Sequence, residues 1–413
     1  MSRYGCIGKT LTHSFSKEIH ARLADYAYEL IELNEEELGP FLTAKEFAAI
    51  NVTIPYKAAV IPYLDEMSDI ARRIGAVNTI VHREGKLYGY NTDYYGMKAL
   101  TTRLNLDLQG KKVLVLGTGG TSKTACVMAE DLGAAQVLTV SRQPAEGVIT
   151  YADAMTAHTD AAVIINTTPC GMYPDGDATP IDLTPFTALE GVVDAVYNPL
   201  RTRLVLDAQH RGIPAAGGLY MLAMQAVVAA ERFTDTAIDP HRAEEAYASV
   251  LASKENIVLI GMPGCGKSTV GKQLAAEGYT LIDTDTEVEK RCGCSIKELI
   301  ATKGEGYFRD LETAVIRDLS TQNGLVIATG GGAVLRQENV NYLKHNGRLF
   351  FLDVPLSRLQ ATADRPLSDT ADKLAALYEQ RIDIYRTAAD VVVPNDTTPD
   401  DAAASILAKR MER

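Results

Sequence analysis

The sequence lacks long apolar runs and any surplus of basic residues. No stretch approaches the roughly 18–20 consecutive apolar residues that a membrane helix needs, and residues 1–5 show no signal-peptide pattern. We therefore expect a cytoplasmic protein without a membrane partner. The 53 acidic residues exceed the 41 lysines and arginines, which gives a net charge of −12. This balance opposes a nucleic-acid partner, because surfaces that bind nucleic acid concentrate lysine and arginine.

Cysteine is also sparse. The six cysteines are scattered along the chain, and only Cys292 and Cys294 lie close together. Their C-x-C spacing fits neither a zinc site nor a redox C-x-x-C motif. We expect reduced thiols without a bound metal, as in most cytoplasmic proteins.

The length and the pattern of the chain predict several α/β domains. At roughly 150 residues per domain, 413 residues should form two to three domains. Apolar strand-like runs alternate with helical patterns from end to end, which is typical of an α/β fold with mostly parallel sheets. A charged helical stretch at residues 241–251 precedes an apolar run at 257–260, with no Gly/Ser-rich or Pro-rich linker. We place a domain boundary near residue 252.

A phosphate-binding loop opens the second half. The motif G-x-x-x-x-G-K-S at residues 261–268 directly follows an apolar strand pattern. Backbone N–H groups and the helix dipole at such a turn receive phosphate oxygens. Lys267 can reach the terminal phosphates of a nucleoside triphosphate, and the Ser268 hydroxyl can ligate Mg²⁺. The motif predicts an ATP and Mg²⁺ site.

Carboxylates and glycines follow this loop. Asp283 and Asp285 stand on alternate positions at a predicted strand end, which places them on the same side of an extended chain. One could serve the metal and the other an acceptor hydroxyl. A strand pattern at 325–329 runs into three glycines at 330–332, where only glycine permits close approach of the backbone to a ligand.

Several arginines could hold anions in this half. Arg309 and Glu312 lie three residues apart and therefore share a helix face. Arg365 and Arg381 could clamp a carboxylate or a phosphoryl group. Any one of these arginines alone could equally be a solvated surface residue.

Residues 256 to about 410 resemble a shikimate kinase. The five motifs that carry the resemblance are the phosphate-binding loop, D-T-D at 283–285, F-R-x-x-E at 308–312, G-G-G at 330–332 and R-P-L at 365–367. The resemblance implies that Asp285 accepts the proton of the shikimate 3-hydroxyl, that Lys267 contacts ATP, and that Ser268 and Asp283 hold the metal. It implies substrate contacts at Arg309, Gly331, Gly332 and Arg381. It implies nucleotide contacts at Gly264, Gly266, Lys267, Ser268, Thr269 and Arg365.

A second glycine-rich turn marks a dinucleotide site in the first half. The sequence G-T-G-G at 117–120 follows the apolar run at 113–116, although it departs from the standard G-x-G-x-x-G. The next strand pattern ends in Ser141-Arg142-Gln143 without an acidic residue. An acid at that position would bind the ribose 2′-hydroxyl of NAD, whereas an arginine suits a 2′-phosphate. We expect NADP(H), although Arg142 could also be a solvated strand-end residue.

Lys57 and Asp93 are candidates for proton transfer. Reduction of a ketone by hydride requires a proton at the developing alkoxide, and a lysine with an aspartate in one polar pocket could supply it. On spacing alone, Lys57 could be a surface residue and Asp93 a helix N-cap.

Residues 4 to about 250 resemble the shikimate dehydrogenase family. The motifs S-x-S, N-V-T-x-P-x-K, G-x-N-T-D, N-T-T-P-x-G-M and G-x-x-M-L-x-x-Q stand at residues 14–16, 51–57, 89–93, 166–172 and 218–225. The resemblance implies a substrate lobe (1–98 and about 218–250), a Rossmann-type NADP lobe (99–217), and Lys57 with Asp93 as the catalytic pair. It implies substrate contacts at Ser14, Ser16, Thr53, Asn78, Tyr197 and Gln225. It implies cofactor contacts at Gly117, Gly119, Gly120, Arg142, Asn166, Thr167, Met172 and Gly218.

Together these resemblances predict a bifunctional enzyme of the shikimate pathway, which leads to chorismate and the aromatic amino acids. The first half would reduce 3-dehydroshikimate to shikimate with NADPH, and the second would phosphorylate shikimate with ATP. One alternative is a catabolic quinate/shikimate dehydrogenase that uses NAD, which Arg142 opposes. Another is a shikimate-sensing regulator without turnover, which the retained Lys57, Asp93, Lys267 and Asp285 oppose. The oligomeric state stays open, and channelling is not required, because fusion alone equalises the amounts of both activities.

Overall fold

The chain folds into two compact units. The structure, a computed structural model, describes residues 3–11, 14–359 and 370–411. The units are Met1–Leu251 and Ala252–Arg413. The boundary falls within helix α9 (Pro240–Lys254). The chain therefore enters the second unit through a continuous helix and not through an irregular linker.

The first sheet of the first unit is mixed. Its strand order is β2-β1-β3-β5-β6-β4, with β1 (Tyr4–Gly8), β2 (Tyr28–Glu32), β3 (Ala49–Val52), β4 (Glu66–Met67), β5 (Thr79–Arg83) and β6 (Lys86–Tyr90). Three of its five strand pairings are parallel, in line with the expectation of mostly parallel strands, but β5 runs antiparallel to both β3 and β6. The cause is the two-residue turn at Glu84 and Gly85, both at positive φ, because so short a loop can join only antiparallel strands.

Helices from both ends of this unit surround the first sheet. They are α1 (Ser16–Leu23), α2 (Glu35–Ala44), the 3₁₀ helix η1 (Ile61–Tyr63), α3 (Asp69–Ile74), α4 (Asp93–Arg103) and α8 (Leu219–Thr234). Asn34 caps α2 by accepting from the backbone N–H groups of Glu36 and Glu37. Helix α8 packs against α1 and α4. It thereby returns the last part of this unit to the lobe that the first hundred residues form.

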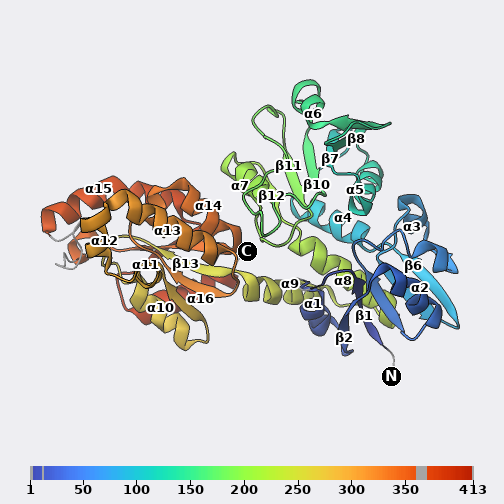
Figure 1. The fold of residues 1–413 in the computed structure, drawn as a ribbon, viewed down its shortest axis with the longest axis horizontal. Helices are drawn as coiled ribbons and strands as arrows, with labels where there is room; N and C mark the ends of the chain where they lie inside the picture. Colours follow the sequence, from blue (N-terminus) through green and yellow to red (C-terminus); the bar gives the residue numbers. More distant parts are fainter. Residues whose placement is uncertain (1–2, 12–13, 360–369, 412–413) are drawn as a thin grey trace. The chain divides into compact units, whose positions relative to one another are not determined.

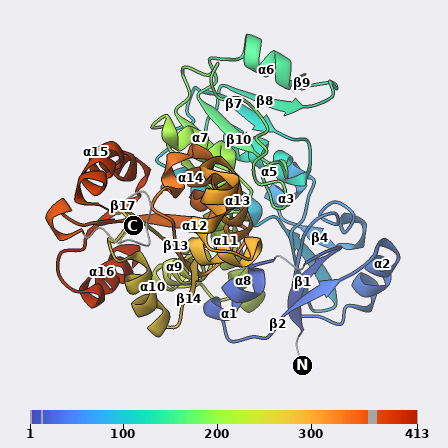
Figure 2. The ribbon, with the colours of Figure 1, turned by 60° about the vertical axis from the view of Figure 1, so that its left-hand side comes forward.

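The second sheet of the first unit is wholly parallel. Its order is β12-β11-β10-β7-β8-β9, with β7 (Lys112–Leu116), β8 (Gln136–Ser141), β9 (Val148–Thr150), β10 (Val163–Asn166), β11 (Gly191–Asp194) and β12 (Ala215–Ala216). Its helices are α5 (Gly120–Asp131), α6 (Tyr151–Ala157) and α7 (Arg203–His210), with α6 beside β9 (Figures 1 and 2). Strands β10 and β11 are buried along their whole length, as parallel strands covered on both faces should be. Helix α5 begins at Gly120, so the last glycine of the G-T-G-G turn already belongs to its first turn.

The second unit holds one parallel sheet. Its order is β14-β15-β13-β16-β17, with β13 (Asn256–Ile260), β14 (Thr280–Asp283), β15 (Leu325–Ala328), β16 (Gly347–Asp353) and β17 (Val391–Pro394). The helices are α10 (Lys267–Ala276), α11 (Thr284–Cys292), α12 (Ile296–Lys303), α13 (Glu305–Ser320), η2 (Ala333–Leu335), α14 (Gln337–Asn346), η3 (Leu356–Arg358), α15 (Ala371–Ala388) and α16 (Pro399–Met411). Figure 1 shows α10 and α16 on one side of the sheet and α13 and α14 on the other. Within the described ranges, no helix has the length and apolarity to cross a membrane.

A buried arginine joins the last helix to the start of the second unit. Arg410 on α16 is 5% exposed. Its guanidinium donates to the carbonyl oxygens of Ala252 and Glu255 and to the Tyr279 hydroxyl, and it lies 3.9 Å from the Glu255 carboxylate. These contacts satisfy carbonyls around the end of α9, which has no cation of its own beyond Lys254 in its last turn.

We expect Arg410→Ala to destabilise the second unit by about 3 kcal/mol, because it leaves a buried carboxylate and two carbonyls without their cation. Hydrogen exchange of the full chain, followed peptide by peptide across a urea series, measures this effect. Peptides from β13, β15 and β16 should lose protection at lower urea than in the wild type. The neighbouring variant Lys409→Ala is the control, since that ammonium contacts a carbonyl at the surface. Equal midpoints in the two variants would contradict the assignment.

Candidate active sites

Lys57 and Asp93, the candidate proton-transfer pair, form an ion pair in the first unit. Lys57 lies in the turn after β3, and Asp93 is the first residue of α4. The Lys57 Nζ atom is 2.6 Å from Asp93 Oδ2, with side chains 15% and 10% exposed. Asp93 is therefore not the N-cap of α4, a position that Thr92 occupies. A largely buried ammonium held by one carboxylate can release or accept a proton at a ligand without exchange with bulk water.

A buried network of neutral side chains lies beside this pair. Asn78 donates to the Thr92 hydroxyl at 3.0 Å and accepts from the Thr92 backbone N–H at 2.6 Å. The Thr92 hydroxyl and the Asn78 amide also face Gln225 Oε1, at 3.2 and 3.5 Å. Asn78 and Gln225 were predicted from the sequence, and Thr92 was not, although it stands within the G-x-N-T-D motif. The network joins α8 to the first sheet through buried hydrogen bonds.

The predicted serines stand at the start of α1. Ser16 is the first residue of α1 and is buried, and its backbone N–H donates to Ser14 Oγ at 3.3 Å. Phe15, between them, packs its ring against Tyr197 at 5.2 Å between centroids. Burial raises the pKa of the Tyr197 phenol to about 12, so it stays a neutral donor. Thr53 lies over the end of β1, where its methyl group would be 2.7 Å from a Cβ on Gly8.

The glycine turn of the second sheet comes close to Lys57. Gly117 has φ +107, and Gly119, the N-cap of α5, has no atom within 4 Å of the place where a Cβ would stand. A Cβ on Gly120 would be 3.8 Å from Lys57 Cδ. The turn is therefore open on one side and adjacent to the proton-transfer pair on the other. Hydride and proton can converge there on one ligand.

Arg142 follows the end of β8 and is exposed. Burial and the Cys170 thiol raise the pKa of the Tyr151 phenol, and the charge of Arg142 opposes that rise. An exposed arginine at the tip of the second strand is available to a 2′-phosphate.

All six cysteines have free thiols, with Cys292 and Cys294 sulfurs 3.5 Å apart.

The ends of β10 and β11 hold a buried amide and a buried carboxyl. Asn166 and Asp194 are both 0% exposed, and Asn166 Nδ2 donates to Asp194 Oδ1 at 2.9 Å. The Asn166 oxygen accepts from the Thr168 hydroxyl and backbone N–H at 2.7 and 3.0 Å. The Asn166 side chain, expected to line the cofactor, is thus used within the protein. Burial raises the pKa of Asp194 to about 7, and the sequence interpretation had assigned it no role.

The other residues expected around the cofactor remain near this edge. The Thr167 hydroxyl donates to the Leu116 carbonyl at 2.6 Å. Met172 is 46% exposed, which leaves it free to cover a planar ring. Gly218 is the N-cap of α8, and a Cβ there would lie 2.3 Å from the Ala195 carbonyl oxygen. Glycine is therefore required at this position for packing alone.

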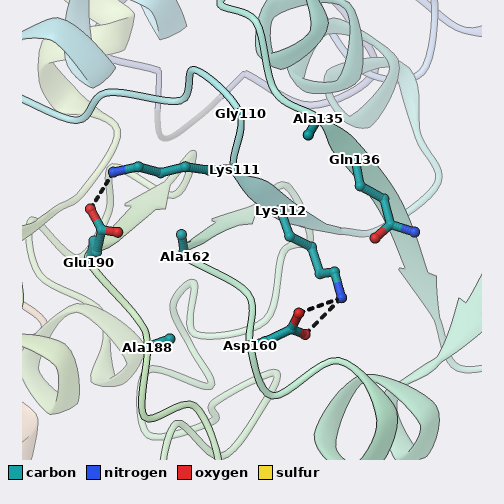
Figure 3. A pocket seen from close by; sticks show the side chains of 9 residues that line it. All are labelled: Gly110, Lys111, Lys112, Ala135, Gln136, Asp160, Ala162, Ala188 and Glu190. Atoms are coloured by element: carbon teal, nitrogen blue, oxygen red, sulfur yellow. Dashed lines mark hydrogen bonds and ion pairs between the residues drawn. The ribbon is translucent and has the colours of Figure 1, made fainter.

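A hollow of about 370 Å³ lies at the opposite edge of the second sheet (Figure 3). Lys111 and Lys112 line it from the start of β7, and they pair with Glu190 and Asp160. Figure 3 shows Lys111 reaching Glu190 on one side and Lys112 reaching Asp160 on the other. Since each ammonium already faces a carboxylate, the hollow has no unbalanced cation among these lining residues for an anionic ligand.

In the second unit, the phosphate-binding loop has the expected form. Gly264 and Gly266 have φ of +82 and +92. Lys267 begins α10, is 9% exposed, and donates to the carbonyls of Gly261 and Met262 at 2.7 and 3.0 Å. The exposed residues Ser268 and Thr269 follow. Asn395, after β17, donates to the Cys265 carbonyl at 2.7 Å and so supports the loop from across the sheet.

The two aspartates after β14 differ from the sequence expectation. Strand β14 ends at Asp283, and Asp285 lies in the first turn of α11, so the extended geometry predicted for this pair is wrong. Asp283 caps the helix, accepting from the Asp285 and Thr286 backbone N–H groups at 3.1 and 3.3 Å. Its other oxygen accepts from Ser268 Oγ at 2.7 Å. Burial, with the charges of Glu312 and Asp283, raises the pKa of Asp285 to about 6.

The glycines at 330–332 allow charged side chains to approach the backbone. A Cβ on Gly330 would lie 2.5 Å from Asp285 Oδ1 and 2.7 Å from Glu312 Oε1, and one on Gly332 would lie 2.3 Å from Arg309 Nη2. Arg309 and Glu312 form an ion pair at 2.8 Å with side chains 11% and 0% exposed. Asp285, the candidate base, and Arg309 thus both lie against the glycine backbone at 330–332.

Two groups on α15 hold this glycine stretch. Arg381 is 7% exposed and donates to the Gly331 carbonyl at 3.2 Å, and the Tyr385 hydroxyl donates to the same oxygen. The Thr284 hydroxyl accepts from the Gly330 N–H at 2.9 Å. Tyr385 and Thr284 were not predicted, although Thr284 stands within the D-T-D motif at 283–285. Arg365 lies outside the described residues.

Comparison with known proteins follows this division. A family model described as shikimate dehydrogenase substrate binding domain matches residues 6–80, and one described as shikimate kinase matches residues 263–412. A curated shikimate dehydrogenase (NADP(+)) of Clostridium beijerinckii is 35% identical over 265 residues, which are 60% of this chain and 97% of that protein. One from Geobacillus kaustophilus is 36% identical over 60% of this chain and 98% of its own length.

Solved structures of shikimate dehydrogenases are also similar to this chain over 60% of its length. Shikimate 5-dehydrogenase of Thermus thermophilus, in complex with NADP(H) and shikimate, has a TM-score of 0.55 at 31% identity and covers 60% of this chain and 99% of that chain. A chorismate mutase/shikimate 5-dehydrogenase fusion protein of Clostridium acetobutylicum has a TM-score of 0.57 at 33% identity, over 60% of this chain and 97% of that one. The chain therefore belongs to the shikimate dehydrogenase family through its first unit and carries a shikimate kinase domain in its second.

Proposed function

We propose that this chain is a bifunctional enzyme of aromatic amino-acid biosynthesis. Its first unit reduces 3-dehydroshikimate to shikimate with NADPH, and its second phosphorylates shikimate to shikimate 3-phosphate with ATP and Mg²⁺. The observation that supports this most directly is that one unit holds a formed Lys57–Asp93 pair and the other a formed Arg309–Glu312 pair, with Asp285 beside Glu312 at Gly330. Both reactions concern small molecules, and the proposal assigns them to the cytoplasm.

The residues of the glycine turn fit NADPH. Gly119 leaves open space at the start of α5, where N–H groups and the helix dipole favour a pyrophosphate, and Arg142 offers a cation to a 2′-phosphate. When bound, NADPH supplies the hydride. Lys57 stabilises the oxygen of the ketone as negative charge develops and gives it a proton, and Asp93 holds the ammonium in place. Thr53, Asn78 and Gln225 bind the hydroxyls and ring of the substrate. Ser14 and Ser16 bind its carboxylate.

The residues of the second unit fit ATP with Mg²⁺. Ser268 and Asp283 present hard oxygen donors side by side, and a magnesium site of this kind takes its other ligands from phosphate and water. ATP, when bound with Mg²⁺, supplies the phosphoryl group. Asp285 accepts the proton of the attacking hydroxyl, and its raised pKa, about 6, still leaves it ionised at neutral pH. Arg309 and Arg381 bind the substrate carboxylate, and Glu312 fixes Arg309.

The alternatives are weaker. A dehydrogenase that uses NAD should place an acid where Arg142 stands. A regulator without turnover does not require a buried ammonium–carboxylate pair or a carboxyl group whose pKa is raised toward neutrality. Both features therefore favour an enzyme. Rates with NADPH and NADH, measured side by side, separate the first alternative from the proposal.

The direct test is conversion of 3-dehydroshikimate to shikimate 3-phosphate by the full chain with NADPH, ATP and Mg²⁺. We expect Lys57→Ala to lower NADPH oxidation by at least about a hundredfold, since it removes a general acid, while phosphorylation of added shikimate continues. Lys267→Ala should do the reverse. Absence of shikimate 3-phosphate with folded wild-type protein would refute the proposal.

Gly119→Ala tests the cofactor turn separately. The position has φ −80 and open space for a Cβ, so alanine should leave the fold unchanged. A bound pyrophosphate would meet the new methyl group, so we expect the Kd for NADPH to rise about tenfold or more. NADPH fluorescence measures it, and the kinase rate of the same chain is the internal control. A Kd equal to that of the wild type would place the cofactor elsewhere.

A further inference from the structure

The Asp194 carboxyl group joins three separate segments at the ends of β10 and β11. In the parallel register Asn166 lies opposite Asp194. Asp194 Oδ1 accepts from Asn166 Nδ2 and from the Val196 backbone N–H, both at 2.9 Å, and Oδ2 accepts from the Thr202 hydroxyl at 2.6 Å. The group is fully buried. No step of the proposed chemistry uses it.

These partners lead to the parts of the chain that face the nicotinamide in the proposed function. Asn166 precedes Thr167 and uses its side-chain oxygen to hold Thr168. Val196 precedes Tyr197, and its carbonyl accepts from the Gly218 N–H at 2.8 Å. One carboxyl group therefore fixes the loop after β10, the loop after β11 and, through Val196, the start of α8.

We propose that Asp194 is a positioning residue for the nicotinamide end of the cofactor, acting through Asn166 and the loop at 195–199. This inference rests on the NADPH-dependent reduction proposed above. Asp194 itself does not touch the cofactor, because its side chain is enclosed by the three donors.

The surroundings of Asp194 favour its neutral form and therefore predict which substitution it tolerates. Burial raises its pKa to about 7, against the hydrogen bonds from Thr202, Val196 and Asn166. Burial, and after it the Asp194 carboxyl group, raises the pKa of the Cys170 thiol. Asparagine can accept from Asn166 and Val196 and donate to the Thr202 hydroxyl. Alanine leaves three donors without an acceptor.

The experiment uses the full chain and measures NADPH binding by fluorescence, apart from turnover. We expect Asp194→Ala to raise the Kd for NADPH about tenfold, with a much smaller change in the KM for 3-dehydroshikimate, and Asp194→Asn to stay within about threefold of the wild type. Asp160→Ala is the matched control. That carboxylate lies at the other end of β10, pairs with Lys112 and is 66% exposed (Figure 3), so its loss should leave the Kd unchanged. The kinase rate of each variant reports the amount of intact chain.

A swap of the two side chains covers the case in which Asp194→Ala fails to fold. Asn166→Asp places two carboxyl groups side by side and should weaken NADPH binding about tenfold. Combining it with Asp194→Asn restores an amide next to a carboxyl, and most of the affinity should return. An unchanged Kd in Asp194→Ala, equal loss for both ligands, or no recovery in the swap would overturn the inference. Lack of NADPH oxidation by the wild type would instead refute the proposed function.

Discussion

Stretches of backbone without side chains set how closely the reacting groups approach in both units. In the second unit, any side chain on Gly330 would collide with Asp285 and Glu312, and any on Gly332 would collide with Arg309. The base, the arginine and the carboxylate that orients it therefore share a space that exists only because these positions are glycine. A single methyl group there would displace charged atoms that are held by 2.8 Å contacts, which accounts for the close link between this motif and the chemistry.

The same constraint operates in the first unit, where it brings two lobes together. The glycine turn belongs to the second sheet and Lys57 to the first, yet a Cβ on Gly120 would stand 3.8 Å from the Lys57 side chain. Gly218 packs with even less room against the Ala195 carbonyl. Gly218 therefore admits no side chain, whereas a Cβ on Gly120 would make only an ordinary contact with Lys57. The side chains of Lys57 and Asp93 are largely shielded from solvent, which limits exchange of their protons with bulk water.

The sequence predicted many residues of the motifs and missed the hydrogen bonds that join distant segments. Lys57, Asp93, Gln225, Arg309 and the glycines were predicted because family motifs contain them, whereas Thr92 and Thr284 were missed although they also stand in motifs. Asp194 and Asn166 are 28 residues apart, and Tyr385 and Gly331 are 54 apart, so no local periodicity connects them. The geometry of Asp285 was wrong for a local reason, since Asp283 both ends β14 and caps α11. The antiparallel β5 was missed because the turn at Glu84 and Gly85 was not weighed. Each error concerns a hydrogen bond that a chain makes only after it has folded.

The charge of the chain bears little on the anionic ligands of either unit. Desolvating a cation is costly unless a partner compensates for it, and both catalytic units solve this locally, with Lys57 on Asp93 at 2.6 Å and Arg309 on Glu312 at 2.8 Å. The net charge of −12 can therefore lie on solvated faces without weakening the sites, because water and salt screen it there. Each pair is also complete within its own unit.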